Sequence, residues 1–126
     1  MRASRATGRR TAAQQTGGDA EERAAEFLAG KGLSILARNY RTRFGEIDLV
    51  AADGEVLVFV EVRLRSSDLF GDAAASVTET KQRRIAAAAR GYLSQLRREP
   101  PCRFDVIALD GDKPTWLRAA FETGAG

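Results

Sequence analysis

The strongest constraint on the fold is the apolar run Val56–Val62, which a single acid, Glu61, interrupts. The β-branched and aromatic residues of this run favour a strand that is buried on both faces. Asp53-Gly54 lies shortly before it, and this dipeptide is a strong signal for a tight turn between antiparallel strands. Residues 45–50 alternate acidic and aliphatic side chains, as in a half-buried strand. The chain should therefore form a sheet whose central strand carries a buried carboxylate.

Two helices are predicted by capping-box patterns, in which Asp or Ser is followed three residues later by Glu. The pairs are Asp19 with Glu22 and Ser76 with Glu79. Apolar residues with a helical period follow each pair, so we expect one helix over residues 20–30 and a second that runs to about Arg98. Gly32 should end the first helix, and Pro100-Pro101 should stop the second.

Two further apolar segments, 33–37 and 104–109, have the composition of short strands. The second helix separates the segment 104–109 from the strand at 56–62, and a connection of this length favours parallel pairing. Asp110-Gly111-Asp112 predicts a turn, while the state of residues 115–121 is left open. The predicted fold class is α/β. We expect a mixed central sheet, built from a three-strand meander and a parallel strand reached by a helix crossover, with helices flanking it.

The 126 residues suffice for one ordinary domain, which we place at residues 18–122 with a short tail at 123–126. Residues 1–17 hold four arginines, no acid and no apolar period, so we expect a disordered basic arm. Such an arm suits binding to nucleic acid and is equally compatible with a solvated tail. Because no apolar run reaches the length of a membrane span, we expect a cytoplasmic protein without a membrane partner.

The chain contains no histidine and a single cysteine, Cys102. These counts exclude Ser-His-Asp triads, Cys-His pairs, zinc fingers and imidazole acid–base catalysis. A hydrolytic metal site would have to consist of aspartate and glutamate, whose oxygen atoms suit Mg²⁺ or Mn²⁺. Any catalytic centre is therefore to be sought among the acidic side chains.

Side-chain alternation places four charged residues on one face of the predicted hairpin. They are Glu46, Asp48, Glu61 and Arg63. If Asp53-Gly54 forms a two-residue turn, Ala52 faces Glu55 and Glu46 falls opposite Glu61. Asp48 then falls opposite Phe59 and is a diagonal neighbour of Glu61. We therefore expect three acids close together on one face of the sheet.

The buried Glu61 charge needs compensation, because like charges repel and an unpaired buried carboxylate is costly. Two kinds of compensation fit the sequence. A divalent cation would neutralise the acids, or Arg63 would form a purely structural ion pair, and the spacing does not decide between these. Glu21 borders the buried face of the first helix and is a further candidate ligand. An exposed first-turn Glu that the helix dipole favours is the simpler explanation of Glu21.

The second helix carries candidate contacts to nucleic acid. Lys81 and Gln82 lie near its start, where their side chains could reach solvent or the acidic face. Arg83, Arg90 and Arg97 recur every seven residues along one side, and such a stripe suits phosphates. Arginines on the outer face of a helix are also ordinary in soluble domains, so the stripe alone predicts no ligand.

Several ordered motifs resemble the bacterial YraN-like family of uncharacterised proteins, and together they cover nearly everything from residue 18 to residue 121. The motifs are GEIDLV at 45–50, VFVEVRLR at 58–65, FG at 70–71, KQ at 81–82 and RFDV at 103–106. Members of this family look like the PD-(D/E)xK nuclease superfamily, which has a restriction-endonuclease-like core and is similar to archaeal Holliday-junction resolvases. Since such resolvases commonly act as dimers, the resemblance also implies a homodimer.

The resemblance implies roles for the acids. It places the motif aspartate at Asp48, the motif glutamate at Glu61 and the helix glutamate at Glu21. In that superfamily these acids bind one or two Mg²⁺ ions, which activate a water for attack on a phosphodiester. The sequence departs from the pattern where Arg63 replaces the motif lysine and where Ala20 replaces a common glycine.

The replacement of the motif lysine bears directly on activity. Arginine stays protonated and its planar fork suits phosphate oxygens, so Arg63 is expected to clamp a phosphate rather than act as a general base. Lys81 is a candidate substitute for the missing lysine, and Gln82 is a candidate contact to nucleic acid or water. Two functions follow: a Mg²⁺- or Mn²⁺-dependent endonuclease acting on DNA, or a nucleic-acid-binding module on the same fold that has lost turnover.

Overall fold

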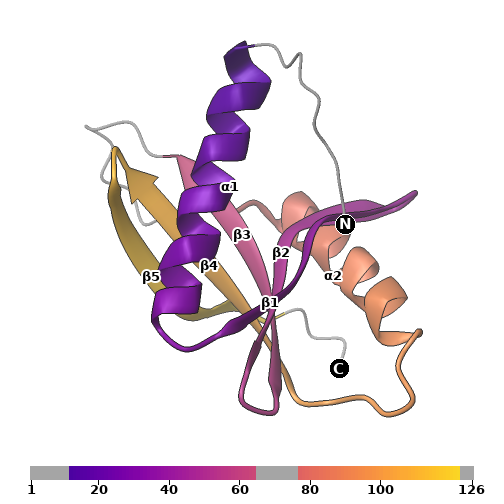
Figure 1. Cartoon of the computed structure of the whole chain (residues 1–126). Helices are drawn as coiled ribbons and strands as arrows, with labels where there is room; N and C mark the ends of the chain where they lie inside the picture. The colour runs from indigo at the N-terminus through magenta and orange to yellow at the C-terminus, as the bar shows by residue number, and fades with distance from the viewer. Residues whose placement is uncertain (1–11, 65–76, 123–126) are drawn as a thin grey trace.

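Five strands form one mixed sheet with a helix on each face (Figure 1). The computed structural model describes residues 12–64 and 77–122. The elements are α1 (Ala12–Gly30), β1 (Ser34–Thr42), β2 (Gly45–Asp53), β3 (Val56–Leu64), α2 (Glu79–Leu93), β4 (Cys102–Asp110) and β5 (Lys113–Phe121). The strands follow the order β1-β2-β3-β4-β5, with β3 parallel to β4 and the other neighbours antiparallel. The predicted α/β class, the meander and the parallel crossover are confirmed.

The segment that the sequence left open is the edge strand β5. It pairs with β4 through a tight turn at Gly111-Asp112, where Asp110 faces Lys113. Gly111 has a φ of 63°, a conformation that glycine adopts without steric cost. The predicted turn at residues 110–112 is therefore confirmed, and it joins β4 to the edge strand β5.

The helix α1 begins at Ala12, so the predicted start near residue 20 is wrong and Asp19 is not its N-cap. The prediction stopped at Gly17-Gly18 because each glycine lowers helix propensity by about 1 kcal/mol. The C-terminal end is as predicted. The Gly32 N–H donates to the Ala29 carbonyl (3.0 Å) and the Leu33 N–H donates to the Leu28 carbonyl (3.1 Å), while Gly32 has a φ of 97°. This bonding pattern is a Schellman motif.

The helix α2 is shorter than predicted. Its N-cap is Thr78, whose Oγ1 accepts a hydrogen bond from the Lys81 N–H (3.1 Å); the predicted cap Ser76 lies outside the described residues. The helix ends at Leu93 rather than near residue 98, because most helical stability comes from packing an apolar face and Leu96 beyond it is 39% exposed. Within the described part of the chain, neither helix is long and apolar enough to cross a membrane.

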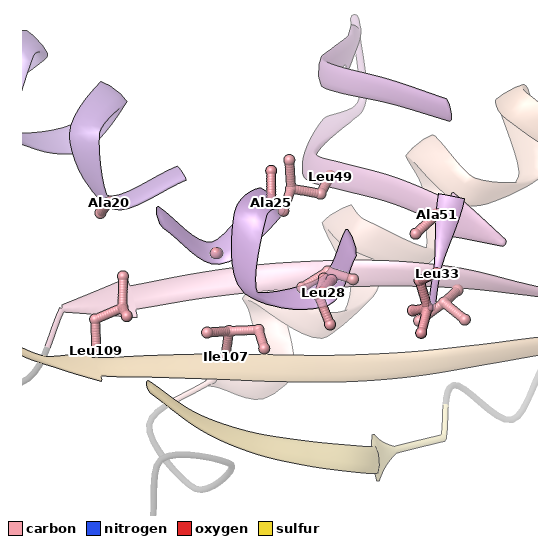
Figure 2. Packing of buried hydrophobic residues seen from close by; sticks show 11 residues of the cluster. Ala20, Ala25, Leu28, Leu33, Leu49, Ala51, Ile107 and Leu109 are labelled. Carbon is pink, nitrogen blue, oxygen red and sulfur yellow. The ribbon is translucent and has the colours of Figure 1, made fainter. Parts of the chain in front are cut away.

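One face of the sheet is covered by α1 through small buried side chains. Ala20, Ala24, Ala25 and Leu28 lie against aliphatic residues of β2, β3 and β4, as Figure 2 shows for part of the cluster. Alanines at these positions let the helix axis approach the strands closely. This packing holds residues 20–28 of α1 against the sheet, and it thereby fixes the position of Glu21.

The opposite face packs against α2, and at Gly45 the backbone of β2 lies close to the backbone of α2. Ile85, Ala88 and Ala89 of α2 lie in one cluster with apolar residues of β2, β3 and β4. A Cβ added at Gly45 would overlap the backbone carbonyl of Arg84. A glycine at the start of β2 is therefore required for α2 to lie where it does.

Strand β1 extends further than the sequence indicated. The apolar segment 33–37 predicted a short strand, but β1 continues through the polar residues 38–41 to Thr42. As an edge strand it has exposed positions on both faces, so its sequence lacks the expected apolar alternation. Asn39 within it has a φ of 51°, which marks a local irregularity.

The predicted pairing between β2 and β3 is wrong by two residues. Asp53 faces Val56, so the turn consists of Gly54-Glu55 and not of Asp53-Gly54. Gly54, with a φ of 62°, is the first residue of the turn, whereas an Asp-Gly turn would place it second. The regular pairing ends with Leu49 opposite Val60, and Phe59 faces Val50. Asp48 therefore does not face Phe59, and Glu46 does not face Glu61.

Gly45→Ala is expected to destabilise the protein by about 1–3 kcal/mol, since overpacking at a backbone contact forces α2 away from β2. Urea unfolding monitored by circular dichroism measures the change. Gly30→Ala is the matched control, because nothing lies within 4 Å of a Cβ added there. Equal stability of the two variants would contradict the packing described here.

Candidate active site

Glu61 is a buried charge on the central strand β3, with only 4% of its surface exposed. Two cations compensate it. Arg63 Nη1 lies 3.3 Å from Glu61 Oε2, and Lys81 Nζ of α2 lies 3.5 Å from the same oxygen. Both cationic side chains are about one-third exposed, so they connect the buried carboxylate to solvent. The Arg63 ion pair, one of the two explanations that the sequence left open, is present, and Lys81 joins it.

Asp48 of β2 lies beside Glu61 on the neighbouring strand. Its Oδ2 accepts a hydrogen bond from the Val62 N–H (2.8 Å). Burial, followed by the negative charge of Glu61, raises the pKa of Asp48 to about 7, against 3.8 ordinarily. The Val62 hydrogen bond and the charge of Lys81 act in the opposite direction. Asp48 and Glu61 thus form an electrostatically coupled pair of carboxylates.

An irregularity in β2 accounts for the position of Asp48. Ile47 and Val50 both pack in the cluster under α2, although strict alternation would send residues three apart to opposite faces. Leu49 packs in the other cluster, under α1. The alternation therefore breaks at Asp48, which interacts electrostatically both with Glu61 and with Glu21 of α1.

Glu21 is half-buried on α1 and near Asp48. Burial, and next the charge of Asp48, raise the pKa of the Glu21 carboxyl, while a hydrogen bond from Asn39 and the charge of Arg41 lower it. In the described part of the chain no three acidic, histidine or cysteine side chains come together as a metal-ligand group. The structure thus brings Asp48 and Glu61 together and leaves Glu21 at the margin of the pair.

Glu46 does not share a face with Glu61, contrary to the prediction from alternation. Its neighbour Ile47 packs under α2, so Glu46 lies toward the other side. There its Oε1 is 3.3 Å from Arg41 Nε, and its charge contributes to the raised pKa of Glu21. Glu46 is therefore a neighbour of Glu21 and lies outside the central pair.

The candidate nucleic-acid contacts on α2 separate into different surroundings. Lys81 reaches Glu61, as described above, whereas Gln82 donates from Nε2 to the Val77 carbonyl (2.9 Å). Arg83 is 3.8 Å from Glu79 on an exposed part of the helix, and Arg90 is exposed. Residue 97 follows the end of α2, so the predicted seven-residue stripe has only two members on the helix. The motif at 70–71 lies outside the described residues.

The sequence interpretation missed a second buried carboxylate. Asp105 of β4 is fully buried and accepts hydrogen bonds from Arg103 Nε (2.9 Å), Arg103 Nη2 (3.0 Å), Trp116 Nε1 (2.8 Å) and the Ala119 N–H (2.9 Å). Arg103 Nη1 is also 3.2 Å from Asp53 Oδ2. An acid inside the apolar run 104–109 was the available signal. Because its carboxylate accepts four hydrogen bonds, Asp105 has a structural role, and we call Asp105 with these partners the anchor.

A groove in the described part of the chain lies away from the acids. It has a volume of about 800 Å³ and runs between α2 and the strands β4 and β5. Its apolar lining includes Phe59, Phe104 and Phe121, whose rings stack in sequence. Neither Asp48 nor Glu61 lines it, so its size says nothing about chemistry at the carboxylate pair.

The carboxylate pair fits a hard divalent cation. Asp48 and Glu61 offer oxygen ligands. Burial, and next the charge of Glu61, raise the pKa of Asp48, and a bound cation would favour its ionised form. Lys81 and Arg63 can turn toward solvent or a phosphate when a cation takes over their role at Glu61, since both are partly exposed. The carboxylate oxygens of Asp48 and Glu61 are donors of the type that suits Mg²⁺ or Mn²⁺.

The pKa of Asp48 predicts how stability depends on pH. Between about pH 4 and pH 7 the folded state holds a proton that the unfolded state has released, so the free energy of unfolding should fall as pH rises through this range and level off above it. Asp48→Asn keeps an acceptor for the Val62 N–H and removes the titration. We expect this variant to have a flatter profile and, at pH 8, to be more stable than the native protein by roughly 1–3 kcal/mol.

Urea unfolding from pH 4 to pH 8 in EDTA measures both profiles. Asp112→Asn is the control, since that side chain is 93% exposed, and its profile should follow the native one. Parallel profiles for the native protein and Asp48→Asn would contradict the coupling of the two carboxylates.

The model of "Uncharacterised protein family UPF0102" matches residues 20–109, which include Glu21, Asp48, Glu61 and Lys81. The UPF0102 protein of Nitrosospira multiformis is 54% identical over 109 residues, covering 84% of this chain and 92% of the relative. That of Cupriavidus taiwanensis is 56% identical over 114 residues, covering 89% and 86%. That of a Janthinobacterium species is 51% identical over 113 residues, covering 90% and 92%. These names state no activity. On this similarity the chain belongs to the UPF0102 family, the YraN-like family that its motifs resemble.

Proposed function

We propose that this protein is a nuclease of the PD-(D/E)xK type that uses Mg²⁺ or Mn²⁺ to hydrolyse phosphodiester bonds of DNA. The observation that carries the proposal is the pair of carboxylates, Asp48 and Glu61, on adjacent strands with Lys81 and Arg63 beside them. A restriction-endonuclease-like core would have the features described above: a meander that carries the acids, a helix crossover to a parallel strand, and a helix on each face.

Each side chain has a distinct role in this proposal. Asp48 and Glu61 would hold the cation, which when bound supplies Lewis-acid stabilisation and a more acidic water. Arg63 presents a planar guanidinium at the rim of the pair, where it would bind the non-bridging oxygens of a phosphate. Lys81 takes the place of the missing motif lysine: it comes from α2 rather than from β3, and its ammonium lies at the same carboxylate oxygen.

The ionisation of Asp48 connects activity with pH. A carboxyl with a pKa of about 7 is half protonated at neutral pH, and a divalent cation binds only its ionised form. Affinity for Mg²⁺ should therefore rise between pH 6 and pH 8 and release protons on binding. Glu21, next to Asp48, would contribute through its charge or a water rather than as a direct third ligand.

A second candidate function is a nucleic-acid-binding module without turnover. The observation in its favour is that Glu61 already has two cationic partners, so that its charge is compensated without a metal. In this case the fold and the basic side chains persist, binding is sensitive to salt, and no strand is cut.

Cleavage of a labelled panel of single-stranded, duplex, flapped and four-way DNA tests the proposal. We expect cuts in Mg²⁺ or Mn²⁺ and none in EDTA. Asp48→Asn and Glu61→Gln should each lower the rate by roughly a hundredfold or more, because each removes a charged ligand from the cation. Arg63→Lys should retain cleavage, since a cation remains at the phosphate.

The control for cleavage is Asp112→Asn, which should cut like the native protein because its side chain is exposed and remote in sequence from the pair. Salt-sensitive binding with no cutting by the native protein, and cutting gained in Arg63→Lys, would assign the chain to the binding module. The absence of both binding and cutting would rule out both functions.

Thermal unfolding of Glu61→Gln separates a metal site from a structural ion pair. We expect the native protein to gain several degrees in Tm at millimolar Mg²⁺, and the variant to gain none. Without metal, the variant should differ from the native protein by less than about 1 kcal/mol, because Arg63 and Lys81 can both reach solvent. A loss of about 3 kcal/mol or more with no effect of Mg²⁺ on the native protein would assign Glu61 a purely structural role.

A further inference from the structure

The turn between β1 and β2 presents an arginine and an aromatic ring to solvent. Thr42 faces Gly45, so the two residues of the turn are Arg43 and Phe44. Phe44 is 66% exposed, the highest exposure among the large apolar side chains of the described residues. The Arg43 guanidinium lies 5.2 Å from the centre of the Phe44 ring, in a cation–π arrangement. In Figure 1 this turn protrudes at the upper right, beyond the body of the sheet.

The ring of Phe44 has no role in holding the turn. Thr42 Oγ1 accepts hydrogen bonds from the Phe44 N–H and the Gly45 N–H (both 3.1 Å). The same hydroxyl is 3.1 Å from the Gly45 carbonyl and donates to it. These bonds involve the Thr42 side chain and the backbone only, so the turn needs no aromatic side chain at residue 44. The Phe44 ring, with the Arg43 guanidinium beside it, is therefore free to contact a ligand.

The turn belongs to the same part of the surface as the carboxylate pair. Gly45 contacts the backbone of Arg84, so the base of the turn lies against α2. Asp48 follows Gly45 by three residues of β2, a distance of about 10 Å along a strand. Among the described residues, neither Arg43 nor Arg84 has an acidic side chain within 4 Å. Two exposed guanidinium groups, one in the turn and one on α2, are therefore available for phosphates.

We propose that the Arg43-Phe44 turn binds an unpaired or unstacked base next to the site of cleavage. The ring of Phe44 would stack on the base while Arg43 and Arg84 contact the flanking phosphates. Aromatic stacking needs an accessible π-face, which a base in an intact duplex does not offer, so the turn would favour bulged, gapped or single-stranded DNA. The ligand class rests on the proposed function, since both require nucleic acid at this surface.

Binding of fluorescent DNA in EDTA tests the proposal without cleavage. Two probes are compared, a fully paired duplex and the same duplex with one unpaired 2-aminopurine. Phe44→Ala should weaken binding of the bulged probe by about 5- to 150-fold and of the paired duplex by less than about twofold. It should also abolish the quenching of 2-aminopurine that stacking causes. Phe44→Trp should restore both signals.

Leu96→Ala is the matched control, because Leu96 is also an exposed apolar residue but lies on a different segment. This variant should bind both probes like the native protein. Arg43→Ala should weaken both probes similarly and lower the salt dependence by about one phosphate contact. Thermal unfolding of Phe44→Ala should match that of the native protein, since Thr42 holds the turn.

Equal binding of the bulged probe by Phe44→Ala and Leu96→Ala would overturn the proposal. So would equal losses on both probes, or the failure of the native protein to bind either. A change in sedimentation coefficient in Phe44→Ala would overturn it too, by showing that the ring contacts a second copy of the chain. If the native protein cuts DNA while Phe44→Ala binds normally, only this inference fails. Phe44-dependent binding without cutting would leave the inference standing and refute the proposed hydrolysis.

Discussion

A carboxylate inside the central strand is the constraint on which the rest of this structure depends. Burying Glu61 at 4% exposure is tolerable only because cations meet it from two directions. Arg63 comes from the same strand, but Lys81 must come from α2, which therefore has to begin at this end of the sheet. The closeness of α2 in turn depends on Gly45, since any side chain there would push the Arg84 backbone away. The burial of Glu61 thus requires both the position at which α2 begins and a glycine at residue 45.

The break in the alternation of β2 has an energetic meaning. A regular strand would have placed Asp48 fully on one face, either exposed or among apolar side chains. Instead it lies where the charges of Glu61 and Lys81 reach it, and burial, followed by the Glu61 charge, raises its pKa to about 7. The folded chain thus keeps two carboxylates in mutual repulsion. Such an arrangement opposes stability, and carboxyl groups with strongly shifted pKa values are concentrated at functional sites.

Much of the fold could be predicted from the sequence, because the features that determine it are local. The run Val56–Val62 and the parallel crossover follow from residue type and segment length, and both are confirmed. The β2–β3 register could not be read reliably from the sequence. Moving the turn by one residue, from Asp53-Gly54 to Gly54-Glu55, shifts the pairing by two residues and leaves each side chain on the same face. The broken alternation at Asp48 and the extension of β1 through polar residues depend on tertiary contacts that no local pattern reports.

The residues of the candidate site could be predicted from the sequence, but their arrangement in space could be predicted only in part. The acids Asp48 and Glu61 stood out because charges are rare in apolar strands, and the structure brings them together. The separation of Glu46 from them, and the position of Lys81 against Glu61, required the packing of α2. Asp105 has the same sequence signature as Glu61, yet its four hydrogen bonds give it an opposite role.

The anchor around Asp105 affects residues well beyond β4. Arg103 links Asp105 to Asp53, and Arg118 of β5 lies 3.6 Å from the same Asp53 carboxylate. Asp53 is the last residue of β2 before the turn to β3, so the hairpin is tied at its closed end to the two strands beyond it. Sliding of β2 along β3 would have to break these ion pairs. The ion pairs at the closed end of the hairpin therefore fix the register of β2 against β3. This register keeps Asp48 beside Glu61, although the two carboxylates repel each other.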